Sequence, residues 1–170
     1  MKKFMALFIA LISIYLAGCQ SGEKSSKFTV DPNPAIEDAL KNKKILILIF
    51  ESEDCQYCTK LHKEVLDQPD FKEKLIKNNI KLGIINVYGD RMVIDPETGA
   101  KMEESALAAA YRVTGYPTII VFDPKQNFKV IFYNPGYIPK KDFMDFLDYL
   151  GSGCYEKIKF DKYIENGKKC

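Results

Sequence analysis

The chain has 170 residues, of which 46% are hydrophobic, and it carries 25 basic against 23 acidic side chains. This length is enough for one domain with a proper core. The charges are nearly balanced and no basic block is present, which argues against a nucleic acid or a strongly acidic molecule as partner.

The first residues are typical of an export signal. Lys2 and Lys3 form a positive start, and the apolar stretch 4–16 is of signal-peptide length, too short and too poorly flanked for a membrane span. The sequence Leu-Ala-Gly-Cys at 16–19 resembles the lipobox of bacterial lipoproteins, which implies that Cys19 is acylated and becomes the mature N-terminus. An ordinary secretory signal or an uncleaved anchor is the alternative. We therefore expect a lipoprotein signal peptide over 1–18 and a periplasmic protein, lipid-anchored to a bacterial membrane.

The rest of the chain divides into a polar tether over 19–30, one domain over 31–150 and a C-terminal tail over 151–170. Hydrophobic periodicity predicts strands at 43–50, 80–87, 117–122 and 128–133, and helices at 35–41, from 55 to near 69, at 70–78, 103–112 and 139–150. The turn signal at 95–99, inside the long connection 88–102, favours a small hairpin. The order predicts an α/β domain, in which a mixed sheet has helices on both sides.

Two cysteines spaced by two residues, Cys55 and Cys58, follow the apolar run 45–50 and open a predicted helix. A helix N-terminus favours negative charge, so it stabilises a thiolate on Cys55, and only a thiolate attacks a disulfide. We therefore expect Cys55 to be the nucleophile and Cys58, one turn further in, to be the resolving cysteine. The alternatives are a structural disulfide or half of a zinc site. Zinc needs about four ligands, and the sequence has no second CxxC and no pair of histidines, so neither a metal nor another cofactor is expected.

Further motifs give the chain a family resemblance over about residues 35–150. The CxxC at a strand end, together with Gly-Tyr-Pro-Thr at 115–118 before the next strand, resembles proteins of the thioredoxin fold. Within that superfamily the chain is most similar to the SoxW-type periplasmic thioredoxins, through the segments 50–58, 63–66, 86–90 and 135–139. The resemblance implies a thioredoxin fold with an insertion after the second core strand. It also implies a cis bond before Pro117, with Tyr116 and Pro117 lining the substrate groove, and it makes Tyr57 a candidate substrate contact.

The chain departs from cytosolic thioredoxins at the buried acid. They carry an aspartate six residues before the first cysteine, where this chain has Ile49, and they have a tryptophan beside the motif, which is absent here. A group that exchanges protons with Cys58 must then come from elsewhere, and the candidates are Glu51, Glu53, Asp54 and His62. His62, the only histidine, shares a helix face with both cysteines and could shuttle a proton or, in a less favoured interpretation, complete a copper site with them. A solvated helix residue is the simpler interpretation.

The remaining cysteines, Cys154 and Cys170, flank the tail. A structural disulfide that holds the tail is the preferred interpretation, and a second redox relay or an intermolecular bridge is the alternative. The tail aromatics are expected to pack on the domain. Tyr88 and Met92, in the long connection, are candidate partner contacts, with an ordinary loop role slightly favoured.

Together these features predict an exported thiol–disulfide oxidoreductase, acting as a monomer. It would reduce the disulfides of periplasmic client proteins and be recharged by an inner-membrane electron donor of the thiol-reductase type. The membrane would be a partner through lipidated Cys19. A disulfide oxidase or isomerase is one alternative, and a non-catalytic metal- or protein-binding module on the same scaffold is the other.

Overall fold

The computed structural model describes residues 28–170, so the expected signal peptide and Cys19 lie outside the described residues. Every element predicted between 35 and 150 is present, with ends within a few residues of those expected. In chain order the elements are α1 (Asn33–Asn42), β1 (Ile45–Glu51), α2 (Gln56–Leu61), a π-helical turn η1 (His62–Leu66), α3 (Pro69–Lys77), β2 (Ile80–Asn86), β3 (Met92–Ile94), β4 (Lys101–Glu103), α4 (Glu104–Ala110), β5 (Thr118–Asp123), a 3-10 turn η2 (Pro124–Gln126), β6 (Lys129–Pro135), α5 (Lys140–Gly151), a 3-10 turn η3 (Cys154–Glu156) and α6 (Phe160–Glu165).

The central sheet has four strands in the order β2-β1-β5-β6. β1 runs parallel to β2 and antiparallel to β5, which in turn is antiparallel to β6. The apolar sequence of β1 is explained by this position, because a central strand is buried on both faces and cannot alternate apolar with polar residues. The mixed sheet that the sequence predicts is therefore confirmed.

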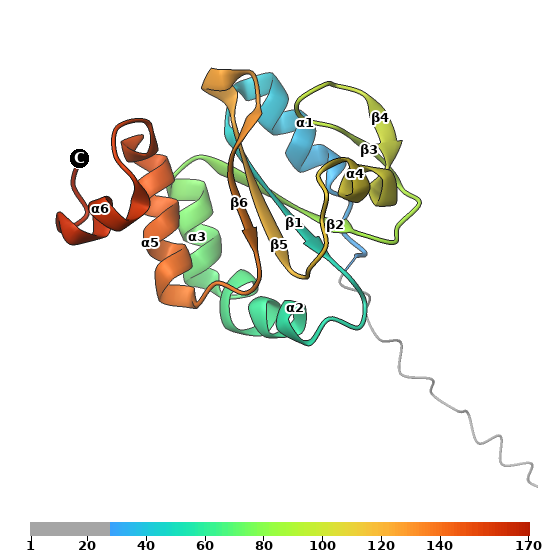
Figure 1. The fold of residues 1–170 in the computed structure, drawn as a ribbon, viewed down its shortest axis with the longest axis horizontal. Coiled ribbons are helices and arrows are strands. Elements are labelled where there is room, and N and C mark those ends of the chain that lie inside the picture. Colours follow the sequence, from blue (N-terminus) through green and yellow to red (C-terminus); the bar gives the residue numbers. More distant parts are fainter. Residues whose placement is uncertain (1–27) are drawn as a thin grey trace, which may run out of the picture.

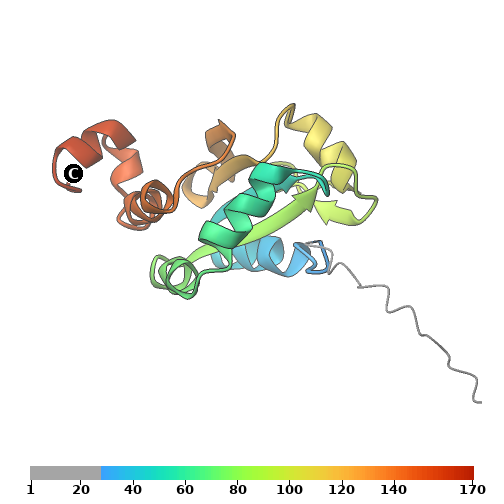
Figure 2. The same ribbon diagram turned by 90° about the horizontal axis from the view of Figure 1, so that it is seen from below.

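Helices cover both faces of the sheet, and two apolar clusters form the core. The larger core cluster joins a face of the sheet to α2, η1, α3 and α5, through residues such as Leu61, Phe71 and Phe143. The other joins the opposite face to α1 and α4, through Ile36, Leu107 and others. Figure 1 shows α3 and α5 on one side of the sheet and α1 and α4 on the other, and Figure 2 shows the same layers from below. The α/β architecture is thus the one that the resemblance implies.

The long connection 88–102 contains a small hairpin, as its turn signal predicts. β3 and β4 pair antiparallel, and the turn between them is held by Asp95, whose carboxylate accepts hydrogen bonds from the Glu97 backbone N–H and the Thr98 hydroxyl. Gly99 has a φ of 72°, which a residue without a Cβ adopts at little cost. The Tyr111 hydroxyl, at the end of α4, also donates to Asp95, and this contact ties the hairpin to the domain.

The start of the described chain lies against the domain. Phe28 is buried, and the Arg91 guanidinium donates hydrogen bonds to the backbone carbonyls of Phe28 and Val30. Residues 28–30 were expected at the end of the polar tether, but these contacts make them part of the folded unit. Between residues 28 and 170, no helix combines the length and the apolar character that crossing a membrane requires.

The C-terminal tail packs on α5. Tyr163 of α6 is buried in the larger core cluster, and its ring lies 5.2 Å from that of Tyr149. The Tyr149 hydroxyl donates to the backbone carbonyl of Ile158, and a disulfide joins Cys154 to Cys170. The chain therefore continues its core beyond residue 150 and does not trail into solvent.

Replacing both Cys154 and Cys170 with serine is expected to lower the free energy of unfolding by about 3 kcal/mol, because the unfolded chain regains the freedom that a closed loop removes. Urea unfolding of the oxidised protein and of the double variant measures the difference. Equal midpoints for the two proteins would show that the bond adds no stability to the tail.

Candidate functional site

Cys55 and Cys58 lie where the chain passes from β1 into α2. Cys55 is the N-cap of α2, with an extended backbone, and Cys58 lies within the first turn. A disulfide with an S–S distance of 2.02 Å joins them, and the Cys58 backbone N–H donates to the Cys55 Sγ at 3.0 Å. In the reduced protein, this N–H and the helix N-terminus would stabilise negative charge on the Cys55 sulfur.

The two cysteines differ in their exposure. Cys58 is fully buried, whereas Cys55 is partly accessible to solvent. Leu61 and Val65, one and two turns further on, are buried in the larger core cluster and fix the helix on the sheet. The geometry therefore offers one sulfur to an incoming group and keeps the second sulfur behind it.

The loop before β5 lies beside the disulfide-bearing loop. The peptide bond between Tyr116 and Pro117 is cis. Phe50, near the end of β1, pairs with Thr118 at the start of β5, which places the Pro117 loop next to the chain that leads to Cys55. The Thr118 hydroxyl donates to the Gly115 carbonyl at 2.7 Å, and the N–H of Gly136, directly after β6, donates to the Pro117 carbonyl at 2.7 Å, so the loop is held from both sides.

Aromatic side chains lie at the cis-proline loop and between the two cysteines. The hydroxyl groups of Tyr88 and Tyr116 lie 3.2 Å apart, and their rings meet edge to face. Tyr57 is 63% exposed and Tyr88 is 73% exposed, so both aromatic rings are accessible to a binding partner. Met92 is also exposed, but it lies in β3, where its backbone carbonyl accepts a hydrogen bond from Asn33. Of the two candidates in the long connection, the structure therefore brings only Tyr88 to the cis-proline loop.

A buried acid lies at the end of β1, two residues beyond Ile49. Glu51 is fully buried, and its Oε2 lies 3.0 Å from the Nε2 of His62. The other ring nitrogen of His62, Nδ1, lies 3.7 Å from a carboxylate oxygen of the exposed Asp67. The hydrogen bond to Glu51 raises the pKa of His62, against the opposing effect of burial, and Asp67 adds to the increase. His62 is therefore no solvated helix residue, which corrects the simpler interpretation.

The other two proton-transfer candidates are placed differently. Glu53 and Asp54 lie in the turn between β1 and Cys55, and both are exposed. Nor do residues 28–170 contain a group of three or more histidine, cysteine, aspartate or glutamate side chains arranged to hold a metal ion. Of the groups considered for proton exchange, Glu51 and His62 are in direct contact with each other.

Sequence reasoning missed two contacts at the site. The link between Glu51 and His62 joins a strand to a helix, and nothing in their spacing of eleven residues indicates it. The contact between Tyr88 and Tyr116 spans 28 residues. The signal available for Tyr88 was its position directly after a buried strand that ends beside β1.

Comparisons with known proteins agree with this fold. Residues 32–151 match the family model of the thioredoxin-like domain. A thioredoxin-fold protein from Helicobacter pylori has 27% sequence identity and a TM-score of 0.58, over 78% of this chain and 89% of that one. A thioredoxin from Thermus thermophilus has 24% identity and a TM-score of 0.53, over 71% and 86% of the two chains. No curated protein sequence matches.

Proposed function

The chain belongs to the thioredoxin-like domain family, and on that premise we propose that it is an exported thiol–disulfide oxidoreductase that reduces disulfides of periplasmic client proteins. The observation that carries the proposal is the disulfide between Cys55, partly exposed at a helix N-terminus, and buried Cys58. A purely structural disulfide needs neither a solvent-accessible sulfur nor a helix N-terminus that would stabilise its thiolate.

The reaction begins with the reduced pair. The Cys55 thiolate attacks one sulfur of a client disulfide, so a bond forms between Cys55 and the client while the second client sulfur leaves as a thiolate. Cys58, once deprotonated, attacks the Cys55 sulfur and releases the first client sulfur. The client gains two electrons and two protons, and the Cys55–Cys58 disulfide that remains is the oxidised enzyme. A membrane thiol donor then returns two electrons to it.

Client binding is proposed at the loop of Tyr116 and Pro117. An extended client segment would pair with the backbone of Tyr116, as a strand adds to a sheet edge. The Tyr88 ring contacts Tyr116 at this loop, and Tyr57 lies between the two cysteines, so both exposed rings would contact client side chains close to the disulfide. Aromatic rings supply such contact area at a low cost in side-chain entropy.

Glu51 and His62 are proposed to manage the proton of Cys58. The second step requires a thiolate on a sulfur that is fully buried, where the thiol is the favoured form. His62 lies one helical turn after Cys58 and contacts buried Glu51, so the pair could accept this proton and pass it toward the exposed Asp67. This interaction takes the place of the aspartate that cytosolic thioredoxins carry at the position of Ile49.

The cellular setting is part of the same proposal. Residues 1–19, with the expected lipobox and Cys19, lie outside the described residues. They support a lipid-anchored protein in the periplasm, served by an inner-membrane donor, because thiols outside the cytosol oxidise unless they are continually reduced. The SoxW-type resemblance suggests clients of periplasmic redox or sulfur chemistry.

The decisive measurement is the reduction potential of the Cys55–Cys58 pair in the purified protein. A reductase should have a value near that of thioredoxin, about −270 mV or lower. A value of about −120 to −180 mV would reverse the direction of electron flow and favour an oxidase or isomerase. A pair without a reversible couple would favour a non-catalytic binding module.

Replacing Cys58 with alanine is expected to trap clients. Without the resolving thiol, the mixed disulfide between Cys55 and the client persists, because the second displacement cannot occur. Non-reducing gels of membrane and periplasmic fractions should show high-mass adducts that collapse on reduction. The same fractions from the Cys55→Ser, Cys58→Ala double variant are the control, and adducts that persist there would not involve Cys55.

A further inference from the structure

The outer edge of β2 has no neighbouring strand within residues 28–170. β2 is the first strand in the sheet order, and it pairs only with β1. The Val87 N–H donates to the Glu51 carbonyl of β1, whereas the N–H of Asn86 points the other way and donates to the carboxylate of Glu104. Backbone groups alternate in direction along a strand, so those of Leu82 and Ile84 also point to the open edge. Such an edge is a template for another strand.

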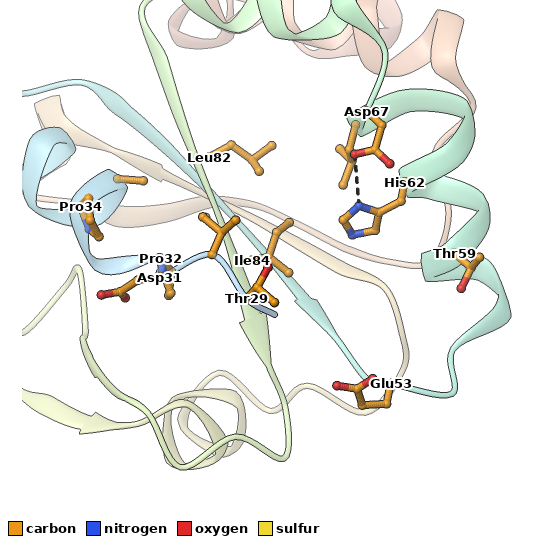
Figure 3. A pocket seen from close by; sticks show the side chains of 14 residues that line it. Thr29, Asp31, Pro32, Pro34, Glu53, Thr59, His62, Asp67, Leu82 and Ile84 are labelled. Atoms are coloured by element: carbon orange, nitrogen blue, oxygen red, sulfur yellow. Dashed lines mark ion pairs between the residues drawn. The ribbon is translucent and has the colours of Figure 1, made fainter. Parts of the chain in front are cut away.

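A groove runs along this edge. It has a volume of about 1010 Å³, and Figure 3 shows Leu82 and Ile84 between the chain segment of Thr29 to Pro34 on one side and the helix of Thr59 to Asp67 on the other. Leu82, Gly83 and Ile84 line it in succession. Leu82 and Ile84 point to one face of the sheet, whereas a Cβ on Gly83 would point to the opposite face and lie 3.2 Å from the Cβ of Pro32. The groove therefore lies along the strand edge and has walls on both faces.

The walls of the groove are largely apolar. Pro32, Pro34 and Ala35 line one side, and Leu66 lies on the other beside the half-buried Leu82 and Ile84. Successive side chains of an added strand point to opposite faces, so one set would contact the apolar wall of Pro32, Pro34 and Ala35 and the other set the wall that carries Leu66 and Asp67. A strand that binds in the groove should therefore have an apolar residue at every second position.

The charges around the groove are unequal. Three carboxylates line it, those of Asp31, Glu53 and Asp67, and none of its lining residues is a lysine or an arginine. The whole chain has 25 basic and 23 acidic side chains, so the groove is more acidic than the protein as a whole. His62 is the one potentially positive group at the groove, and its ring already faces Glu51 and Asp67. A basic occupant would complement this rim.

We propose that the groove binds an extended segment of a second polypeptide, which alternates apolar with basic residues and adds to the edge of β2 as a strand. The chain's own residues 20–27 do not meet this requirement, since Gln-Ser-Gly-Glu-Lys-Ser-Ser-Lys has no apolar side chain for the walls. The groove begins at Glu53 and Thr59, which flank the Cys55–Cys58 motif on the side opposite the cis-proline loop. A bound partner would thus leave the proposed client groove open.

The test uses two short peptides without cysteine, so its result does not depend on redox activity. One alternates valine with lysine, and the other alternates valine with glutamate. Binding to the full-length protein at neutral pH is followed by fluorescence anisotropy, and amide hydrogen exchange reports on the N–H groups of Leu82 and Ile84. The groove variant is Asp67→Lys, and the matched control is Glu73→Lys, which reverses an exposed charge on α3 away from the groove.

The expected result is that the lysine peptide binds, slows exchange at Leu82 and Ile84, and loses at least about threefold in affinity in Asp67→Lys but not in Glu73→Lys. Equal binding of both peptides, or binding without protection of these amides, would overturn the proposal. If the two amides are already protected in the protein alone, a segment of the chain itself occupies the edge, and the assignment to a second polypeptide is wrong.

Discussion

The Cys55→Ser variant is expected to lose disulfide reductase activity by on the order of a thousandfold or more. A serine hydroxyl at this position keeps the size of the side chain and can still accept the backbone N–H of Cys58, but it is not ionised at neutral pH and cannot form a mixed disulfide. Reduction of a disulfide-bonded protein substrate, with a chemical thiol as electron donor, measures the loss. The circular dichroism spectrum should be unchanged.

The second disulfide of the chain supplies the control. The double variant with serine at Cys154 and Cys170 should keep its reductase activity, because that bond joins η3 to the end of the tail, and both segments are remote from α2 in the fold (Figure 1). Substitutions in the Cys55–Cys58 pair are thus expected to change activity, and substitutions in the Cys154–Cys170 pair to change stability. If the Cys55→Ser protein remained active, another cysteine would have to be the nucleophile, and the assignment of Cys55 would be wrong.

The fold was predictable because its strong signals are local. The apolar run of β1 and the amphipathic pattern of α5 specify their elements, and the glycine of the turn at 95–99 specifies a hairpin. The mixed character of the sheet followed from the same signals, since β1 and β2 are connected through helices, as parallel strands are, and β5 and β6 through a short hairpin. The CxxC likewise indicated where the candidate site lies, because the apolar run before it and the helical period after it predict a helix N-terminus at Cys55, where the structure has one.

The environment of the site could not be predicted, because it depends on contacts between distant residues. Glu51 and Glu53 look equivalent in the sequence, yet one side chain is buried against His62 and the other is exposed. The difference arises from where β1 ends, because Glu51 is its last residue and Glu53 lies beyond it in the turn that leads to Cys55. The open edge of β2 could not be predicted either, since the hydrophobic pattern of a strand does not show whether it has a neighbouring strand on both sides.

The Glu51→Gln variant is expected to change the titration of His62 more than any other substitution of a single acid. In the wild-type protein, the hydrogen bond with Glu51 raises the pKa of His62 above its ordinary value of about 6.5. A neutral amide removes the charge that stabilises the imidazolium, while burial continues to disfavour it. The midpoint should therefore fall. Because His62 is the only histidine in the chain, its ring proton gives a single titrating resonance by NMR, and Asp67→Asn, which alters the weaker contact at 3.7 Å, is the matched comparison.

The same shift predicts how stability depends on pH. Folded His62 holds its proton more tightly than unfolded His62, so its contribution is fully present below about pH 6.5 and is lost as pH rises through the raised pKa of the folded state. Urea unfolding between pH 6 and pH 9 should show this decline in the wild-type protein. In Glu51→Gln the decline should be smaller, and the free energy of unfolding at pH 6 should be lower by about 1–3 kcal/mol. Identical pH profiles for the two proteins would mean that Glu51 and His62 do not share a proton in solution, and the proposed route from Cys58 would lose its first acceptor.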